Sequence, residues 1–253
     1  MVRYDVRMKP LVSLALLLCS LAAGQGARAE TINVYTSANF APLVLGDGRG
    51  IYPDLISHLN RHQPGGHTFR LSYLPRKRLQ VKLEEGSLDG VVIGMMPEWL
   101  ADSEQKKYHW TAPFATDRFA LVSLVTKPID PHRRGTLRGA SVGLTSGYVY
   151  PNIDAWFAGV RVLRRVGVSD EKNIEKLLLG RVDCVIVAES MARYFMRTHK
   201  LNGQMQIVPL PGPVTERRFL VQRRDAALFN VLAPAARTLK DDPAWRRAAA
   251  AYE

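Results

Sequence analysis

The sequence predicts an α/β fold built from two similar lobes, and three observations lead to that prediction. Strand-like and helix-like segments alternate along the chain, which is typical of parallel sheets covered by helices. Continuous apolar runs such as residues 91–93 are typical of strands that are buried on both faces. One unit occurs twice, at Gly86–Ile93 and again at Gly180–Val187, and the two copies begin 94 residues apart. This offset is too long for a solenoid repeat, and it indicates two lobes of one kind.

The first elements of the expected fold follow in order along the chain. Apolar and polar residues alternate over residues 32–36 and again over 69–73, which predicts two strands. Between them we expect a helix with Pro53 in its first turn, since proline suits that position, and the Pro-Gly-Gly sequence at 64–66 ends it. A second helix is expected to begin at Pro75.

Each copy of the repeated unit is preceded by an amphipathic helix. In the first copy Leu79 and Leu83 are four residues apart, and in the second Ile174, Leu177 and Leu178 form the apolar face. The glycine and aspartate that follow, in a Gly-x-x-Asp pattern, are expected to turn the chain into the buried strand.

The first 29 residues have the pattern of a secretory signal peptide. Three basic residues precede an apolar stretch at 11–23, and small residues occupy the cleavage positions at 27 and 29. The alternative is an uncleaved anchor, but this apolar stretch is shorter than the roughly 20 residues that span a membrane. We therefore expect cleavage after Ala29 and a periplasmic protein of residues 30–253.

Composition and charge exclude several classes of protein. The chain has 253 residues, 47% of them hydrophobic, which excludes a disordered chain and a coiled coil. Its two cysteines, Cys19 and Cys184, exclude a disulfide scaffold and a cysteine-rich zinc module. The formal charge is +12, and losing four basic residues and one acid with residues 1–29 lowers it to +9. The basic residues are scattered and are not interleaved with aromatic ones, so we expect no nucleic-acid partner.

Six segments of the chain carry a recognisable pattern in a fixed order. They are 36–42 with Phe-Ala-Pro at its end, 50–55 with a Gly-x-x-x-Asp-Leu helix start, the two repeated units at 83–94 and 178–188, Trp110–Phe114, Leu137–Gly143 and the C-terminal 223–252. With these segments the chain resembles the family 3 extracellular solute-binding proteins, which are the amino-acid-type periplasmic receptors of ABC transporters.

The resemblance implies a type II periplasmic-binding fold with two lobes. Lobe 1 would comprise residues 30–118 plus 213–253, and lobe 2 would comprise 119–212. Two crossing strands, near Phe119–Val122 and Ile207–Pro211, would form the hinge. A small ligand bound in the cleft would favour the closed state, which an ABC transporter permease then recognises. Such a protein is expected to be a soluble monomer without a cofactor.

The family's ligand contacts can be matched to this sequence one position at a time. The aromatic residue comes from the first loop, small or apolar residues from the end of the first repeated strand, and hydroxyl groups from a turn in lobe 2. An acid at a helix start completes the matches, and Asp117 near the predicted hinge either faces the cleft or pairs with Arg118. The expected ligand-binding residues are Phe40, Gly94, Met95, Met96, Trp99, Asp117, Thr145, Ser146, Gly147, Tyr148 and Glu189.

Two family features are replaced in this sequence. The arginine that normally clamps a ligand carboxylate falls on Glu104, and no arginine lies between Gly94 and Pro113. The acid that normally receives an ammonium falls on Ala188, and Glu189 either takes over that role or is a solvated residue at a helix start. We therefore expect an aromatic, apolar cleft without a clamp arginine. The ligand would be small, amino-acid-like, and polar, aromatic or cationic.

Other functions stay open at this point. A few proteins of this fold are periplasmic enzymes resembling cyclohexadienyl dehydratase, and Glu104, Glu189 and His109 have side chains suited to acid–base work. No hydrolase elbow or zinc-protease motif is present, so we expect a binding protein without a catalytic site. A receptor that reports to a sensor kinase is a further alternative. His58, His62 and His67 cluster around the first helix, but we expect no metal site, because zinc needs three or four converging ligands.

Overall fold

The computed structural model describes residues 30–150 and 153–252. The predicted signal peptide, 1–29, lies outside the described residues, so export of the protein stays a prediction. Within the described part of the chain, no helix is both long enough and apolar enough to cross a membrane.

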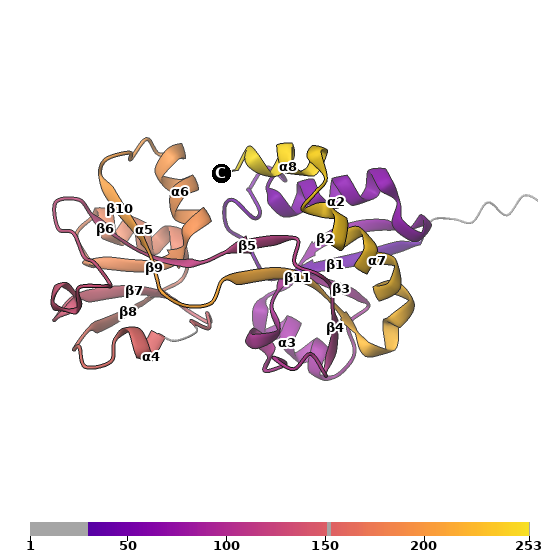
Figure 1. Ribbon diagram of the computed structural model, residues 1–253, viewed down its shortest axis with the longest axis horizontal. Coiled ribbons are helices and arrows are strands. Elements are labelled where there is room, and N and C mark those ends of the chain that lie inside the picture. The colour runs from indigo at the N-terminus through magenta and orange to yellow at the C-terminus, as the bar shows by residue number, and fades with distance from the viewer. Residues whose placement is uncertain (1–29, 151–152, 253) are drawn as a thin grey trace, which may run out of the picture. The chain divides into compact units, whose positions relative to one another are not determined.

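The first sheet is six-stranded and has the order β2-β1-β3-β11-β4, with β5 also paired to β11 (Figure 1). β1 (Thr31–Thr36) lies between β2 (Thr68–Tyr73) and β3 (Gly90–Met95), and all three run parallel. β11 (Thr215–Gln222) runs antiparallel to β3. The short strands β4 and β5 pair with β11, at Tyr108–Trp110 and Ala115–Asp117.

The second sheet is five-stranded and repeats this arrangement. β7 (Ser141–Thr145) lies between β8 (Leu163–Gly167) and β9 (Cys184–Ala188), and these three strands are parallel. β6 (Phe119–Leu124) is antiparallel to β9, and β10 (Met205–Pro209) is antiparallel to β6. The order β8-β7-β9-β6 therefore corresponds to β2-β1-β3-β11 of the first sheet.

The helices follow the strands in the order that the sequence predicts for parallel units. The helices of the first sheet are α2 (Ile51–His62), α3 (Arg76–Glu84), α7 (Ala226–Leu239) and α8 (Pro243–Ala250). Those that follow strands of the second sheet are α4 (Ile153–Trp156), α5 (Asp170–Leu178) and α6 (Glu189–Thr198). Short 3₁₀ turns occur at η2 (Pro64–Gly66), η3 (Pro97–Leu100), η4 (Arg134–Leu137) and η5 (Arg223–Asp225).

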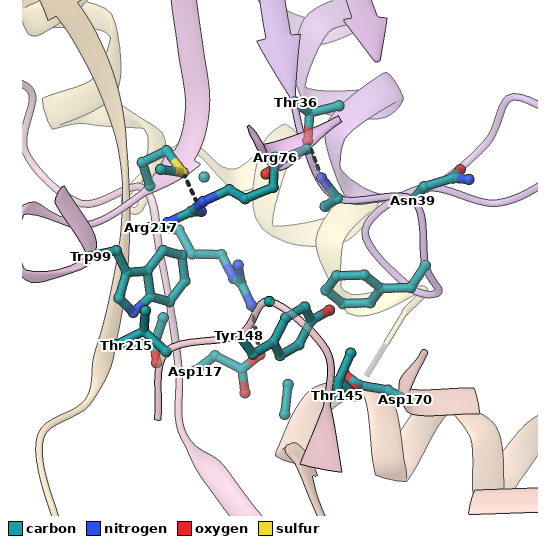
Figure 2. Close-up of a pocket in the computed structure, with 18 of the residues that line it drawn as sticks. Thr36, Asn39, Arg76, Trp99, Asp117, Thr145, Tyr148, Asp170, Thr215 and Arg217 are labelled. Carbon is teal, nitrogen blue, oxygen red and sulfur yellow. Dashed lines mark hydrogen bonds and ion pairs between the residues drawn. The ribbon is translucent and has the colours of Figure 1, made fainter. Parts of the chain in front are cut away.

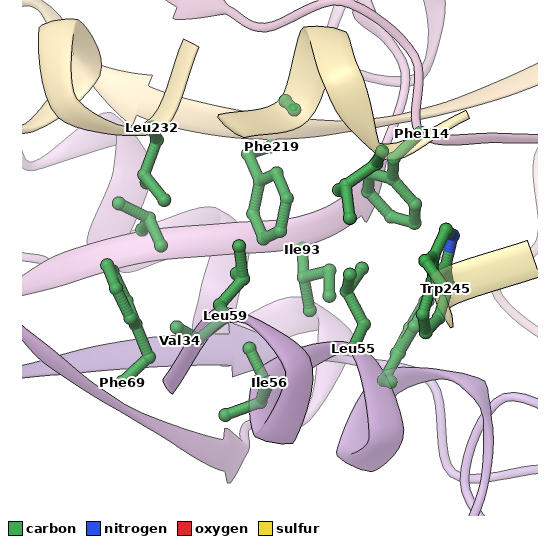
Figure 3. Close-up of a cluster of buried hydrophobic side chains, with 14 of the residues drawn as sticks. Val34, Leu55, Ile56, Leu59, Phe69, Ile93, Phe114, Phe219, Leu232 and Trp245 are labelled. Carbon is green, nitrogen blue, oxygen red and sulfur yellow. The ribbon is translucent and has the colours of Figure 1, made fainter. Parts of the chain in front are cut away.

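Both faces of the first sheet are covered, as the continuous apolar run predicts. On β3, Val91 and Ile93 pack with α2, α7 and α8, and Figure 3 shows this cluster around Leu55, Leu59 and Phe219. Val92 faces the opposite way and packs in a second cluster with α3 residues such as Leu79. Each of these side chains is almost completely buried, which is the alternation expected of a strand inside a two-faced sheet.

The second sheet is built in the same way. Val185 and Val187 of β9 pack with the apolar faces of α5 and α6, while Cys184 and Ile186 pack into a cluster on the other side of the sheet. All four side chains have no solvent exposure. The predicted apolar strand of the second repeated unit is therefore confirmed.

The repeated Gly-x-x-Asp sequence ends a helix and fixes the following strand in both copies. Gly86 and Gly180 follow their helices with φ of 66° and 67°, the left-handed conformation that glycine adopts readily at a helix C-terminus. The aspartate then accepts hydrogen bonds from the neighbouring parallel strand. Asp89 accepts one from the Tyr35 hydroxyl at 2.6 Å, and Asp183 accepts one from the backbone N–H of Ser141 at 2.7 Å. Each aspartate thus ties the buried strand to the central strand of its sheet.

The predicted strands and helices are confirmed with small shifts of their ends. α2 begins at Ile51, which places Pro53 in its first turn as predicted, and the preceding Gly50 has a φ of 126°. The chain passes from the first sheet to the second between β5 and β6, and returns between β10 and β11. The exact lobe limits at 118/119 and 212/213 stay predictions, because strand membership alone does not locate a hinge.

Candidate functional site

A cleft of about 400 Å³ lies at the carboxyl ends of the parallel strands of both sheets. Thr36, Tyr73 and Met95, the last residues of β1, β2 and β3, line it from the first sheet. Thr145 and Ala188, the last residues of β7 and β9, line it from the second. Ligands of open α/β sheets bind at this end of the strands, and the volume suits a small organic molecule.

Most of the residues that we expected in the cleft do line it. The structure brings together Phe40, Gly94, Met95, Trp99, Asp117, Thr145, Ser146, Gly147 and Tyr148. Their arrangement is seen in Figure 2, where Tyr148 lies among the other lining residues and Thr145 lies beside Asp170. Whether each of them contacts a ligand stays a prediction.

Met96 is one of two expected residues that the structure places elsewhere. Successive residues of an extended strand point to opposite sides, so Met95 reaches the cleft and Met96 does not. Met96 is 4% exposed and lines a separate small pocket with Leu210 and Pro211.

Glu189 is the other exception, because it does not line the cleft and its carboxylate is engaged in ion pairs. It is the first residue of α6, and its carboxylate binds Arg118 and, at 2.5 Å, the Nη2 atom of Arg193. Burial alone would raise the pKa of Glu189, but these two guanidinium groups hold it below its usual value. Its lone pairs face arginines, so it is not available to receive a ligand ammonium.

Gly94 permits close packing at the floor of the cleft. It has a φ of 79°, and a Cβ placed on it would lie 1.8 Å from the hydroxyl oxygen of Tyr52. Only glycine therefore allows Tyr52 to occupy its position beneath β3. The Tyr52 hydroxyl in turn accepts a hydrogen bond from Nη1 of Arg217 at 3.4 Å.

Arg217 and Asp117 form a buried ion pair in the wall of the cleft. Nη2 of Arg217 lies 3.3 Å from Oδ2 of Asp117, and both side chains are less than 10% exposed. Asp117 also accepts a 2.6 Å hydrogen bond from the hydroxyl of Ser190 on α6. Arg217 is on β11 of the first sheet, and Ser190 is on α6, which follows β9 of the second sheet. Asp117 therefore contacts one group from each of the two sheets.

Arg76 is a second arginine of the cleft, and it has no carboxylate partner among residues 30–150 and 153–252. Its Nη1 lies 3.3 Å from the sulfur of Met95, and its guanidinium lies 5.7 Å from the centre of the Trp99 ring. Figure 2 shows the Arg76 side chain and its contact with that sulfur. Burial lowers the pKa of Arg76, yet the group stays charged at neutral pH because arginine titrates so high. The cleft therefore contains an uncompensated positive charge.

The position of Arg76 in its helix makes this charge unusual. It is the first residue of α3, which continues with Lys77 and Arg78 and has no acid in its first turn. Cations at a helix N-terminus oppose the helix dipole and cost a few tenths of a kcal/mol or more each. The dipole, Arg76 and its two basic neighbours together create a positive potential at this corner of the cleft.

Asp170 is the corresponding group from the second sheet. It is 1% exposed, Oδ1 accepts a hydrogen bond from the Thr145 hydroxyl, and Oδ2 has no partner among the described residues. Burial raises the pKa of Asp170 to about 6, although the Thr145 hydrogen bond opposes this shift. The side chain is held in place by one oxygen, and the other is left without a donor.

Arg76 and Asp170 occupy equivalent positions of the internal repeat. Each is the first residue of the helix that follows the outer parallel strand, α3 after β2 and α5 after β8. They are 94 residues apart, the same offset that separates Gly86 from Gly180. The two copies therefore place an unpaired cation and an unpartnered carboxylate oxygen at matching corners of one cleft.

The cleft contains arginines, although none occupies the family's clamp position. No arginine occurs where the family would place it, and Glu104 is an exposed residue that pairs with Lys106. The lining arginines are Arg118, which lies beside Asp117 near the predicted hinge, and Arg76 of α3 and Arg217 of β11, which were not expected in the site. One signal in the sequence was available, namely a basic run, 76–78, at the start of a predicted helix where acids are normally favoured.

Aromatic rings form the remaining wall of the cleft. Phe40 and Tyr148 lie with their ring centres 6.3 Å apart, and Tyr148 and Tyr150 lie 6.0 Å apart. The Tyr150 hydroxyl accepts a 2.8 Å hydrogen bond from the backbone of Thr145, so this cluster is anchored to the end of β7. These rings offer apolar surface to a ligand side chain. In the described part of the chain, the cleft contains no cluster of metal-ligating side chains.

Comparison with known proteins shows the fold. No protein-family model matches the chain, and no curated protein matches it. Among solved structures, the substrate-binding protein of an amino acid ABC transporter is 20% identical, with 88% of this chain and 98% of that chain covered and a TM-score of 0.67. The periplasmic VFT2 domain of BvgS from Bordetella pertussis is 18% identical, with 94% and 98% covered and a TM-score of 0.68.

A third similar structure is the ancestral amino acid-binding protein AncCDT-1, described as a precursor of cyclohexadienyl dehydratase. It is 16% identical, with 95% of this chain and 98% of that chain covered and a TM-score of 0.66. The chain thus has the two-lobed α/β fold of family 3 solute-binding proteins, as the sequence predicts.

Proposed function

We propose that the protein is a solute-binding protein that captures a small amino-acid-like ligand, with one carboxylate and one amine, and delivers it to an ABC transporter permease. The observation that carries this proposal is the pair of unsatisfied groups in the cleft, Arg76 and Oδ2 of Asp170. A zwitterion supplies the partner that each of them lacks.

The carboxylate of the ligand is assigned to Arg76. A guanidinium binds a carboxylate through two parallel hydrogen bonds, and such pairs are stronger than neutral hydrogen bonds. Trp99 and the thioether of Met95 lie against Arg76 and exclude water there. Excluding water strengthens the attraction between the guanidinium and the ligand carboxylate.

The amine of the ligand is assigned to Asp170. An ammonium beside Oδ2 would stabilise the ionised carboxylate and lower the pKa of Asp170 from its raised value of about 6. Thr145 keeps the side chain oriented through the other oxygen. A ligand that carries only positive charge would place that charge near Arg76 as well, so a zwitterion is favoured over a purely cationic ligand.

The side chain of the ligand would lie against Phe40 and Tyr148. These rings accept an apolar or aromatic group, and a cationic group above a ring face gains about 0.5–2 kcal/mol. An aromatic or basic amino acid is therefore preferred over an acidic one. Among the similar structures, an ancestral arginine-binding protein bound to arginine is consistent with such a ligand class.

Binding is proposed to act through closure. A ligand held by Arg76 from the first sheet and Asp170 from the second has both contacts only when the two lobes approach each other, so it favours the closed state. The two crossing strands near Phe119–Val122 and Ile207–Pro211 are the proposed hinge. Export through the signal at 1–29, a periplasmic location and a monomeric state complete the proposal.

The proposal is tested by identifying the ligand. Protein purified under native conditions is denatured, and the released small molecules are identified by mass spectrometry. Titration calorimetry then compares L-phenylalanine, L-tyrosine, L-arginine, L-glutamate and the amines lacking the carboxylate. Binding of an aromatic or basic amino acid, with about 100-fold weaker binding of the matching amine, supports the proposal. Binding of the amine as tightly as the amino acid contradicts it.

Two other uses of the same cleft are tested separately. The similarity to the BvgS VFT2 domain favours a receptor role as the second candidate, and ligand-dependent binding to a permease rather than to a sensor kinase distinguishes the two. The similarity to AncCDT-1 keeps a dehydratase in view, since Asp170 with its raised pKa is suited to donate a proton. Turnover of prephenate or arogenate by the purified protein would show that it is a dehydratase rather than a binding protein.

A further inference from the structure

Two histidines and an aspartate come together on α2 and α8, and none of the three lines the cleft. His58 and His62 are four residues apart on α2, so they share one face of the helix. Asp242 is the N-cap of α8, and its Oδ1 accepts hydrogen bonds from the backbone of Ala244 and Trp245 at 2.7 and 3.0 Å. Its Oδ2 is directed at His58 instead.

The separations match those of ligands around one metal ion. Oδ2 of Asp242 lies 3.3 Å from Nε2 of His58, and one ligand atom from each of the three residues lies within 4.8 Å of the others. Two ligand atoms bound to zinc at about 2.0–2.1 Å in tetrahedral geometry are roughly 3.3 Å apart. Only His62, which is exposed, needs to move inward, and a surface side chain changes rotamer readily.

His58 has the properties of a buried ligand rather than of a surface residue. It is 3% exposed beside the Trp245 ring, and its Nδ1 has no hydrogen-bond partner among the described residues. Its single hydrogen bond to Asp242 compensates only part of the cost of burying an imidazole.

We propose that His58, His62 and Asp242 form a binding site for one divalent transition-metal ion of the zinc class, with water completing the coordination. Two imidazoles and one carboxylate suit zinc and exclude calcium and magnesium, which prefer oxygen ligands. The metal would fasten α8 to α2, next to the contact in which the Tyr252 hydroxyl donates to Asp54 at 2.7 Å. Arg61 on the same helix opposes a cation, so a micromolar rather than a nanomolar affinity is expected.

The test uses protein stripped with EDTA and dialysed, with zinc chloride as the probe. Calorimetry is expected to show one zinc per chain, and saturating zinc is expected to raise the Tm by about 5 °C. His62→Ala removes one ligand without opening the core. Asp242→Asn removes the carboxylate but keeps an N-cap residue of equal quality. Both variants are expected to bind zinc at least 10-fold more weakly, whereas His132→Ala, an exposed histidine outside the cluster, leaves binding unchanged.

The proposal is overturned if zinc does not bind the wild-type protein, or if both ligand variants bind it as tightly as the wild type. The Tm of each variant without zinc shows whether it is folded. Because none of these residues lines the cleft, loss of zinc binding leaves the amino acid titrations unchanged, and the two proposals fail independently.

Discussion

In the first sheet the central strand β1 lies between β2 and β3, and in the second sheet β7 lies between β8 and β9 in the same order. Both central strands end in a buried threonine, Thr36 and Thr145, that lines the cleft. The helix that follows the outer strand begins with Arg76 in one copy and with Asp170 in the other. The backbone plan is thus shared, and the charge at the equivalent position is reversed.

This difference teaches how a repeated framework makes a site for an asymmetric ligand. The repeat fixes where a side chain enters the cleft, because the same strand–helix junction is built twice. The residue type at that junction then decides which end of the ligand it receives. Each prediction below changes one copy and uses the other, or a neighbour, for comparison.

The largest effect is expected for Arg76→Ala. Loss of a guanidinium that binds a carboxylate away from bulk water should weaken ligand binding by about 100-fold. Arg76→Lys keeps the charge without the two-pronged geometry and should recover part of the loss. Lys77→Ala, the next residue of the same helix, should change affinity less than about 3-fold. Calorimetry with the identified ligand measures all three, and equal losses for Arg76→Ala and Lys77→Ala would contradict the assignment.

Asp170→Asn should weaken ligand binding by about 10-fold, less than Arg76→Ala, because a hydrogen bond to the ligand amine survives the loss of charge. Wild-type affinity should fall as pH drops below about 6, the raised pKa of Asp170, since protonation removes the negative charge. The variant should lack this decrease. Titrations between pH 4.5 and 8 check both statements, and an identical pH profile for the two proteins would argue against Asp170 as the amine partner.

The same carboxyl group affects stability with the opposite sign. Its folded pKa of about 6 lies above the unfolded value of 3.8, so folding retains a proton that the unfolded chain releases. The free energy of unfolding of the ligand-free protein should therefore fall by about 2–3 kcal/mol as pH rises from 4 to above 6. This component should be absent in Asp170→Asn, as urea unfolding at several pH values would show. If the stability of the wild type does not fall relative to that of the variant over this pH range, the pKa of Asp170 is not raised in the folded protein.

A smaller effect is expected at the aspartates of the two repeated units. Removing the side chain in Asp183→Ala leaves the N–H of Ser141 without its acceptor and should cost about 2 kcal/mol. Asp89→Ala should cost less, since Asp89 is exposed and water can replace it. The pKa of Asp183 is lowered to about 2, mainly by Lys127 and Ser141 against the effect of burial, so its contribution is lost as pH falls from about 4 to 2. If urea unfolding gives the same loss of stability for Asp183→Ala and Asp89→Ala, the different burial of the two aspartates does not affect their contributions.

The smallest effect concerns the reactivity of the Cys184 thiol. Cys184 is fully buried in β9, and burial raises the pKa of its thiol to about 12. It should not react with a thiol reagent in the folded protein and should react at once in urea. The equivalent position of the first copy, 94 residues earlier, is Gly90, where a Cβ would lie 2.2 Å from the carbonyl oxygen of Asn33. Rapid labelling of the folded protein would show that the second sheet opens more readily than its packing indicates.

Much of the fold was predictable because it rests on patterns that are local in the sequence. The apolar runs at 91–93 and 184–188 and the helices before them specify two similar units, and the structure contains both. The end of a helix is less well specified. The start of α2 at Ile51 follows Gly50, whose positive φ the residue type permits but does not require.

The site was less predictable than the fold, because it joins residues that are distant in the sequence. Phe40 and Thr145 were expected because they match, or lie beside, the ligand-contacting segments of the family that the chain resembles. Arg217 was not, because its pairing with Asp117 across 100 residues follows only from the antiparallel register of β11 with β5. Met96 was wrongly included, because side chains alternate between the two faces of an extended segment and that alternation continues beyond the apolar run at 91–93.

The central claim is that Arg76 and Asp170 hold opposite ends of one ligand, and matched ligand analogues test it most directly. Calorimetry on the wild type, Arg76→Ala and Asp170→Asn would compare the identified amino acid with its carboxamide and with its deaminated acid. We predict that the carboxamide penalty, about 100-fold in the wild type, nearly disappears in Arg76→Ala but persists in Asp170→Asn, and that the deamination penalty behaves in the reverse way. A carboxamide penalty of the same size in the wild type and in Arg76→Ala would contradict the claim.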